Sequence, residues 1–249
     1  MVNLERVFLE PCNKRPSALA FIAHGRLGGT MDSPVTSALA ETLRTSWGAR
    51  VVRWNARGIG QSSGRSEWSS LPAWVGEDNC SDYKDIFREE VVRFMDEFPS
   101  ARDCDLFVCG YSCGAIYATT IRMPKDLADR CSNVFNPIRY ILISYPIAIS
   151  PVLGLFRTGW YFRALEGLVG GSWEDCRNEA RADVLILMGK DELGSFLSPV
   201  RIAYNMWMKV LKSKRRAEQG MFDVVVVDGA NHIWHDRLDK LREEVNRWL

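Results

Sequence analysis

Short apolar runs alternate along the chain with longer segments in which apolar residues recur at helical spacing. The runs have the length of strands and cover residues 18–23, 50–54, 106–109, 140–144, 184–188 and 222–227. Most of them are continuous stretches of Val, Ile, Leu and Phe rather than alternating apolar and polar residues. Continuous runs are typical of parallel strands that are buried on both faces.

Two of the intervening segments show a clear helical period. Their apolar positions are Phe87, Val91, Phe94 and Phe98 in one segment, and Leu238, Leu241, Val245 and Trp248 in the other. Strand and helix therefore alternate, which predicts an α/β fold: a mostly parallel central sheet with helices on both faces. We expect a single domain over residues 1–249, with ligands bound at the carboxyl ends of the strands.

The segment 146–182 fits this alternation least well, because it is long for a simple crossover and rich in aromatic residues. It is either a small cap over the site or a crossover helix with an apolar packing face. In either case the fold would carry a minimal or small cap. The residues expected to form an apolar substrate pocket are Tyr111, Ile147, Phe156, Trp160 and Trp234.

Composition narrows the setting in which the protein works. Lys and Arg total 32 against 31 Asp and Glu, a net charge of +1, so no overall field favours nucleic acid or an anionic membrane. We interpret the one basic cluster, at residues 209–216, as a solvated helix end followed by a loop. No apolar stretch is long enough to span a membrane, and the first residues do not resemble a secretory signal.

The seven cysteines are an odd number and do not occur in pairs at the spacing of metal ligands. We therefore expect neither disulfides nor a zinc site. A reducing, cytoplasmic location is the resulting expectation. The expected partner is a small-molecule substrate, and a homodimer is left open.

The candidate chemistry begins at Gly110-Tyr111-Ser112-Cys113-Gly114, which follows an apolar strand and precedes helix-forming residues. The two glycines allow a strand to turn sharply into a helix, which exposes the Ser112 hydroxyl at the tip of the turn. The first N–H groups of that helix are unpaired and favour negative charge. We therefore predict Ser112 as a nucleophile and the Cys113 N–H as an oxyanion donor; the alternative is an ordinary connection with a buried serine.

A nucleophilic serine needs a base and an acid that orients the base. His232 follows the strand 222–227 and is expected at the same sheet edge as Ser112, so it is the predicted base, with His235 as an alternative. Asp191 and Glu192 follow the strand 184–188, and either carboxylate could orient the histidine. The order serine, acid, histidine is that of the α/β-hydrolases.

A second oxyanion donor is expected in the glycine-containing loop 24–29, which follows the first apolar run. We assign this role to the backbone N–H of Arg26, with Leu27 as the alternate. His24 is expected to be structural and hydrogen-bonded within the loop.

Blocks 23–32, 53–64, 110–114 and 229–232 resemble successive motifs of the α/β-hydrolase superfamily. The resemblance spans about residues 18–249 and is closer to compact bacterial and fungal members akin to dienelactone hydrolases and serine esterases. It implies Ser112 as the nucleophile, His232 as the base and Asp191 as the orienting acid.

Two departures from this pattern limit what the resemblance implies. In many relatives the acid follows the strand-end glycine by three residues, whereas Asp191 follows Gly189 by two and Glu192 by three. We prefer Asp191 because Asp-Glu-Leu matches the local pattern if one residue is deleted. The second departure is at the nucleophile. Dienelactone hydrolases use a cysteine, whereas the central position here is Ser112, so the resemblance does not imply lactone specificity.

The predicted function is that of a serine hydrolase acting on an ester or thioester of a small to medium apolar acyl group through an acyl-enzyme. No metal or cofactor is expected. Two alternatives stay open: a non-hydrolytic ligand-binding member of the fold, and an acyltransferase or lyase on the same scaffold.

Overall fold

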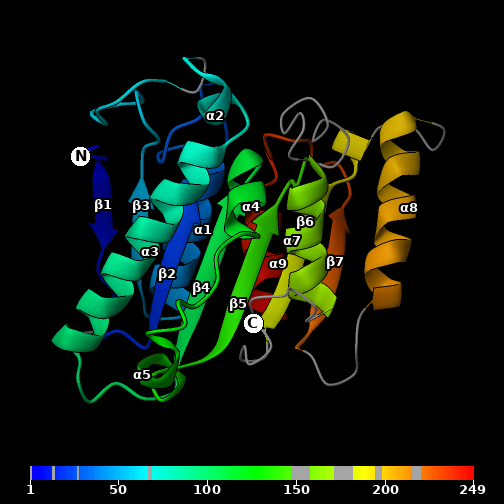
Figure 1. Cartoon of the computed structure of the whole chain (residues 1–249). Coiled ribbons are helices and arrows are strands. Elements are labelled where there is room, and N and C mark those ends of the chain that lie inside the picture. The colour runs from blue at the N-terminus through cyan, green and yellow to red at the C-terminus, as the bar shows by residue number, and fades with distance from the viewer. Residues whose placement is uncertain are drawn as a thin grey trace.

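The computed structural model describes residues 2–12, 15–26, 28–66, 69–146, 158–170, 182–193, 198–214 and 220–249. In this part of the chain the strands form one sheet with the order β1-β3-β2-β4-β5-β6-β7 (Figure 1). The strands are β1 (Arg6–Leu9), β2 (Ala18–Ala23), β3 (Ala49–Trp54), β4 (Cys104–Tyr111), β5 (Phe135–Ile143), β6 (Ala182–Gly189) and β7 (Phe222–Val227). Only the β1–β3 pair among them is antiparallel, which confirms the predicted mostly parallel sheet.

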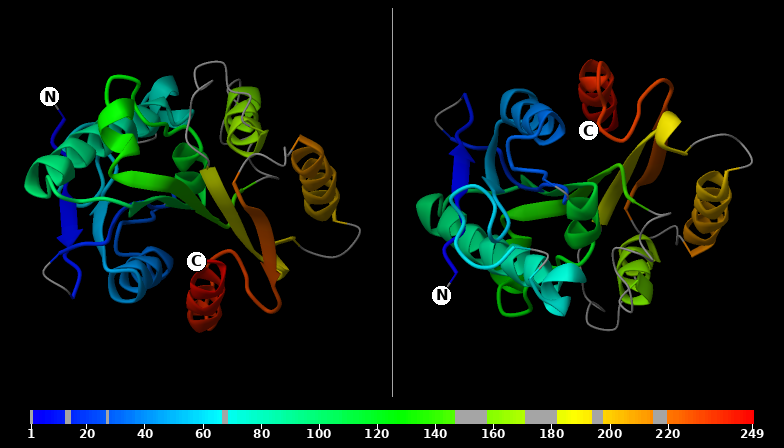
Figure 2. Two further views of the ribbon diagram at one scale, coloured as in Figure 1. Left: turned by 90° about the horizontal axis from the view of Figure 1, so that it is seen from below. Right: turned by 90° about the horizontal axis from the view of Figure 1, so that it is seen from above.

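Helices cover both faces of the sheet (Figure 2). One face carries α1 (Pro34–Ser46) and α9 (Leu238–Trp248), and the other carries α3 (Glu77–Glu97), α4 (Cys113–Ala118), α7 (Thr158–Gly170) and α8 (Pro199–Lys214). Three shorter helices are α2 (Leu71–Trp74), α5 (Ala128–Ser132) and the 3₁₀ turn η2 (Asp191–Leu193).

Each face of the sheet has its own apolar core. Phe21 and Ile22 are neighbours on β2 and are both fully buried, yet they belong to opposite clusters. Successive side chains of a strand point to opposite faces, so a strand covered on both sides must be apolar at every position. This requirement explains the continuous apolar runs in the sequence.

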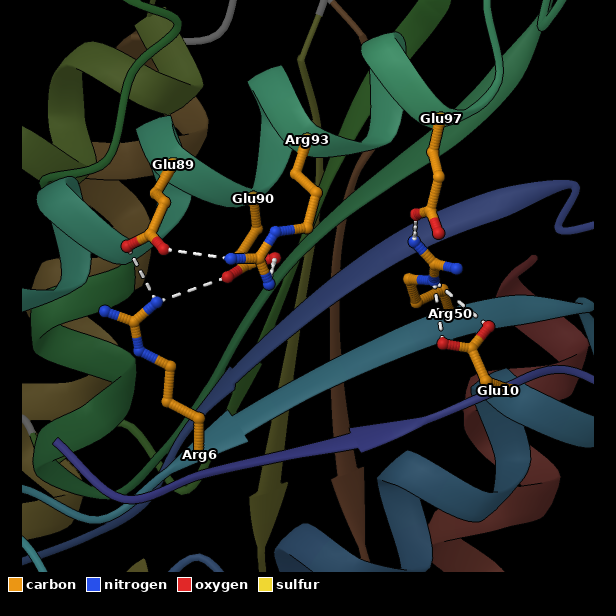
Figure 3. A network of polar contacts seen from close by, with 7 residues as sticks. All are labelled: Arg6, Glu10, Arg50, Glu89, Glu90, Arg93 and Glu97. Carbon is orange, nitrogen blue, oxygen red and sulfur yellow. Dashed lines mark hydrogen bonds and ion pairs between the residues drawn. The ribbon is translucent and has the colours of Figure 1, made fainter.

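The edge strand β1 is tied to the rest of the molecule by ion pairs as well as by its pairing with β3 (Figure 3). Arg6 Nη1 lies 2.8 Å from Glu89 Oε2 and 3.2 Å from Glu90 Oε1, both on α3. On β3, Arg50 Nε lies 2.9 Å from Glu10 Oε1. Burial raises the pKa of Glu90, and the nearby guanidinium groups oppose that shift. These contacts hold β1 and the segment after it against α3 and β3.

The segment expected to be either a cap or a crossover helix contains α7, which connects β5 to β6 and packs on the sheet. Tyr161, Leu165 and Leu168 of α7 are buried in the core that it shares with α3 and α8. Residues 147–157 and 171–181 of this segment, which include Ile147 and Phe156, lie outside the described residues. Among the helices that the structure describes, none is long and apolar enough to cross a bilayer.

Candidate active site

Ser112 lies in a strained turn between β4 and α4. Its backbone angles are φ 55° and ψ −123°, a conformation that costs a non-glycine residue about 1–3 kcal/mol. The turn is held by the Ser112 N–H, which donates to Ile143 O at 2.9 Å. A Cβ on Gly114 would lie 2.2 Å from Ala23 O, so only glycine lets α4 start this close to the end of β2. The strand-turn-helix arrangement predicted around Ser112 is therefore present.

Ser112, His232 and Glu192 form a continuous chain of hydrogen bonds. The distance from Ser112 Oγ to His232 Nε2 is 2.9 Å, and that from His232 Nδ1 to Glu192 Oε2 is 2.8 Å. An ionised carboxylate can only accept, so the proton of a neutral imidazole belongs on Nδ1. Nε2 is then free to accept the Ser112 proton.

The Glu192 carboxylate is well supported on its other side. Its side chain is 8% exposed, and Oε1 accepts from the Gly189 N–H and from Ser144 Oγ, the latter at 3.0 Å. Ser144 Oγ in turn accepts from Trp234 Nε1 at 2.9 Å. Because an indole N–H can only donate, the Ser144 hydroxyl proton is left for its other partners, of which Glu192 Oε1 is the nearer and the backbone oxygen of His232, at 3.5 Å, the more distant. No sequence motif points to Ser144, whose only signal is its position at the end of an apolar run.

The carboxylate that contacts His232 is therefore that of Glu192, and the preference for Asp191 does not match the arrangement found. Asp191 is exposed, and its backbone N–H donates to Ala230 O at 2.9 Å. The η2 turn starts at Asp191 and brings the next side chain back over Gly189. Glu192 is the residue that follows Gly189 by three, so the spacing of the resemblance was the better guide.

The loop that carries His232 is held from β4. Tyr111 Oη donates to the backbone oxygen of His232 at 3.0 Å, and the two rings are 5.7 Å apart. Burial and the charge of Glu192 raise the pKa of Tyr111 to about 12, so the phenol keeps its proton. His235, the alternative base, lies with its Nδ1 2.7 Å from Asp236 Oδ2 and is 72% exposed.

The loop after β2 lies directly against Ser112. A Cβ on Gly25 would lie 3.0 Å from Ser112 Cβ, a tight contact that a larger residue would have to relieve. His24 Nε2 accepts from the Ala56 N–H at 3.0 Å and its Nδ1 contacts Gly25 O, so the side chain is hydrogen-bonded within the loop, as expected, and also to the connection after β3. The Arg26 guanidinium contacts the Trp74 carbonyl oxygen and lies 5.5 Å from the centre of the Trp74 ring. Leu27 lies outside the described residues.

An open groove of about 750 Å³ runs past Ser112; we call it the Ser112 groove. It is bounded by the loop after β2, the first residues of α1, the turn around Ser112 and residues 232–238. Tyr111 and Trp234, two of the expected pocket residues, line it. Trp160 does not: it lies on α7, with Lys84 Nζ 5.9 Å from its ring centre. Its expected place in the pocket is not found.

Comparisons with known proteins give matches among solved structures alone, since no family model and no curated protein matches the chain. An α/β serine hydrolase homologue from Coxiella burnetii is 23% identical, with a TM-score of 0.58, and the match covers 99% of this chain and 91% of that one. A serine hydrolase without a lid from Xanthomonas campestris is 20% identical, with a TM-score of 0.56 and coverages of 100% and 89%. The chain has the α/β-hydrolase fold.

A third match, Est1E from Butyrivibrio proteoclasticus with bound ferulic acid, is 17% identical, with a TM-score of 0.57 and coverages of 99% and 94%. At such identities the likeness shows the fold alone. In this α/β-hydrolase fold, Ser112, Glu192 and His232 follow β4, β6 and β7, whose carboxyl ends share one edge of the sheet. That edge is where open α/β sheets bind their ligands.

Proposed function

We propose that the protein is a serine hydrolase that cleaves a carboxylic ester or thioester through a covalent acyl-enzyme. The observation that carries this proposal is the chain of hydrogen bonds from Ser112 through His232 to Glu192. Glu192 takes the role of orienting acid, in place of Asp191.

In the first half of the reaction, Ser112 Oγ attacks the carbonyl carbon of the substrate while its proton passes to His232 Nε2. The imidazolium that forms is stabilised by the Glu192 carboxylate through the Nδ1–H. Collapse of the tetrahedral intermediate breaks the bond to the leaving group, which takes the proton from Nε2. The acyl group is left on Ser112.

In the second half, a water molecule gives a proton to Nε2 and attacks the acyl carbon. The bond to Oγ breaks, the acid product leaves and Ser112 regains its proton. The backbone N–H groups of Cys113 and Arg26 are the proposed donors to the oxyanion in both halves, each contributing roughly 3–4 kcal/mol in comparable sites. The close approach of Gly25 to Ser112, and the place of Arg26 in the lining of the same groove, support the assignment of Arg26.

The proposed substrates carry a small to medium apolar acyl group. Tyr111, Val35 and Ile233 give the Ser112 groove an apolar lining beside the nucleophile. Pockets of this volume and character accommodate small organic ligands. The bound ferulic acid of Est1E supports an aromatic acid as one such group.

The test is hydrolysis of p-nitrophenyl esters of increasing chain length by the wild-type protein and Ser112→Ala. We expect kcat/KM to fall by about 10⁴-fold in the variant, and a fluorophosphonate probe to label only the wild type. Ser213→Ala, an exposed serine on α8, is the control and should react as the wild type does.

Three results would contradict the proposal. Ligand binding without turnover or labelling would favour a binding protein of this fold. Transfer of the acyl group to added alcohols in preference to water would favour an acyltransferase. Undiminished turnover by Ser112→Ala would exclude the covalent route.

A further inference from the structure

Helix α8 has an unusual charge pattern. It carries Arg201, Lys209, Lys212 and Lys214 and no acidic residue. On α9, by contrast, the cations are paired with acids of the same helix, such as Lys240 with Glu243. Among the helices that the structure describes, α8 is the only one with several cations and no acid.

The outer side of α8 is apolar at its centre. Ile202, Met206 and Val210 follow one another at intervals of four residues and are 47%, 67% and 40% exposed. We call these three residues the α8 ridge. The opposite side of the helix buries Tyr204, Met208 and Leu211 in the core, so the ridge faces away from the molecule. All the views place α8 at the margin of the fold, beyond β7 (Figures 1 and 2).

The cations flank this ridge. At about 100° per residue, Lys209 and Lys214 border it on opposite sides, and Lys212 lies beyond Lys209. Lys209 and Lys212 are exposed and form no ion pair with the described residues, whereas Lys214 Nζ lies 2.9 Å from Glu166 Oε2. In the sequence, Arg215 and Arg216 follow the helix directly. An apolar ridge between cations thus lies on a protein whose total charge is only +1.

We propose that α8 binds the surface of an anionic lipid bilayer, lying in the interface with its ridge toward the acyl chains. A helix with an apolar ridge and flanking lysines suits this position because the apolar side chains enter the headgroup boundary while the ammonium groups remain among lipid phosphates and carboxylates. Each lysine near such a surface adds an electrostatic attraction, which decays with distance over about one Debye length. The proposal goes beyond the proposed hydrolysis and does not depend on it.

The charge pattern favours lipid over two other partners. A second copy packed ridge to ridge would bring together two sets of Lys209 and Lys212, whose charges no described acid balances, and this costs free energy unless acids intervene. A nucleic acid would engage the lysines through its phosphates but would leave the exposed aliphatic ridge unused. A bilayer with anionic headgroups satisfies both features.

The test measures binding of the full-length protein to vesicles of phosphatidylcholine, with and without roughly one-third phosphatidylserine, by flotation. We expect binding to the anionic vesicles at least about tenfold stronger than to the neutral ones, and weaker as salt is raised. Ile202→Ser/Met206→Ser and Lys209→Gln/Lys212→Gln should each reduce it by roughly tenfold or more.

Matched controls distinguish binding through α8 from nonspecific adsorption of the protein to vesicles. Leu71→Ser removes an equally exposed apolar residue on α2, and Lys240→Gln/Arg247→Gln removes the same charge from α9. Both should bind vesicles as the wild type does, and unchanged melting temperatures would show that every variant is folded.

Binding that does not distinguish the two vesicles, or that survives both α8 variants, would overturn the proposal. A dimer seen by light scattering and abolished by Ile202→Ser/Met206→Ser would assign the ridge to a second copy. Binding of duplex DNA that depends on Lys209 and Lys212, without vesicle binding, would assign the cations to nucleic acid.

Discussion

The Glu192 carboxylate meets donors from three places in the chain: His232 after β7, Ser144 after β5 and Gly189 at its own turn. The last two both donate to Oε1, so the two carboxylate oxygens have different environments. Oε1 must be an acceptor, and this leaves Oε2 for the imidazole. This asymmetry governs what a substitution at Glu192 would do.

In Glu192→Gln we expect kcat/KM to fall by about 10⁴-fold. The amide oxygen should take the place of Oε1, which directs the NH₂ group to His232 Nδ1 and leaves the imidazole proton on Nε2. That tautomer cannot accept the Ser112 proton. Asp191→Asn is the matched control, since Asp191 is exposed, and should change kcat/KM by less than about threefold; the opposite ranking of the two variants would return the role to Asp191.

Ser144→Ala removes one donor from Glu192 Oε1 and leaves the buried Trp234 indole N–H without its acceptor. We expect kcat for p-nitrophenyl esters to fall about tenfold, as an orienting carboxylate loses part of its support. Trp234→Phe keeps the Ser144 donor and should have a smaller effect on kcat. An unchanged kcat in Ser144→Ala would show that Gly189 and His232 suffice to hold Glu192.

At the scale of elements, the apolar runs located the buried strands but not their full lengths. The run at 106–109 belongs to β4, which begins at Cys104 and ends at Tyr111 because residues on both sides of the run continue the backbone pairing, with β2 over 105–110 and with β5 at the two ends. The edge strand β1 was missed altogether. It has four partly exposed residues, and its pairing with β3 joins segments more than 40 positions apart, which no local pattern encodes.

A bidentate ion pair joins the connection after β3 to α3. Arg57 Nε and Nη2 lie 2.8 and 2.7 Å from the Asp82 carboxylate, whose side chain is 8% exposed. We expect Asp82→Ala to lower the free energy of unfolding by about 2–3 kcal/mol, because a charge-assisted pair is lost and its cation is left partly buried.

Urea denaturation measures this loss, and the ion pair between Arg88 and Asp126 supplies the control. Both of its side chains are about half exposed, so Asp126→Ala should cost less than about 1 kcal/mol. Equal losses in the two variants would contradict the view that burial decides the value of these pairs.

At the scale of the whole molecule, burial of tyrosines links stability to alkaline pH. Burial raises the pKa of Tyr111 and Tyr204 to about 12, and those of Tyr83 and Tyr145 further. The fold therefore retains phenol protons that the unfolded chain loses above pH 10. Stability from this source is complete below about pH 10 and is lost as the pH rises toward 12.

We expect the melting temperature to fall across that interval, and the fall to be less steep in Tyr204→Phe, which removes one of the titrating phenols. Differential scanning calorimetry of both proteins at matched ionic strength provides the comparison. Parallel curves for the wild type and the variant would contradict the assignment to Tyr204.

The sequence by itself determined the α/β class, the buried strands, and the positions of Ser112 and His232. Each of these depends on local physics: an apolar run that must be covered on both faces, a glycine-flanked turn, and a loop directly after a strand. The tertiary structure alone decided which carboxylate meets His232, because the η2 turn exposes Asp191 and folds Glu192 back over Gly189. It also placed Ser144 and Trp234 behind that carboxylate, and Trp160 outside the lining of the groove. These positions depend on residues that are distant in the chain and come together only when the sheet is assembled.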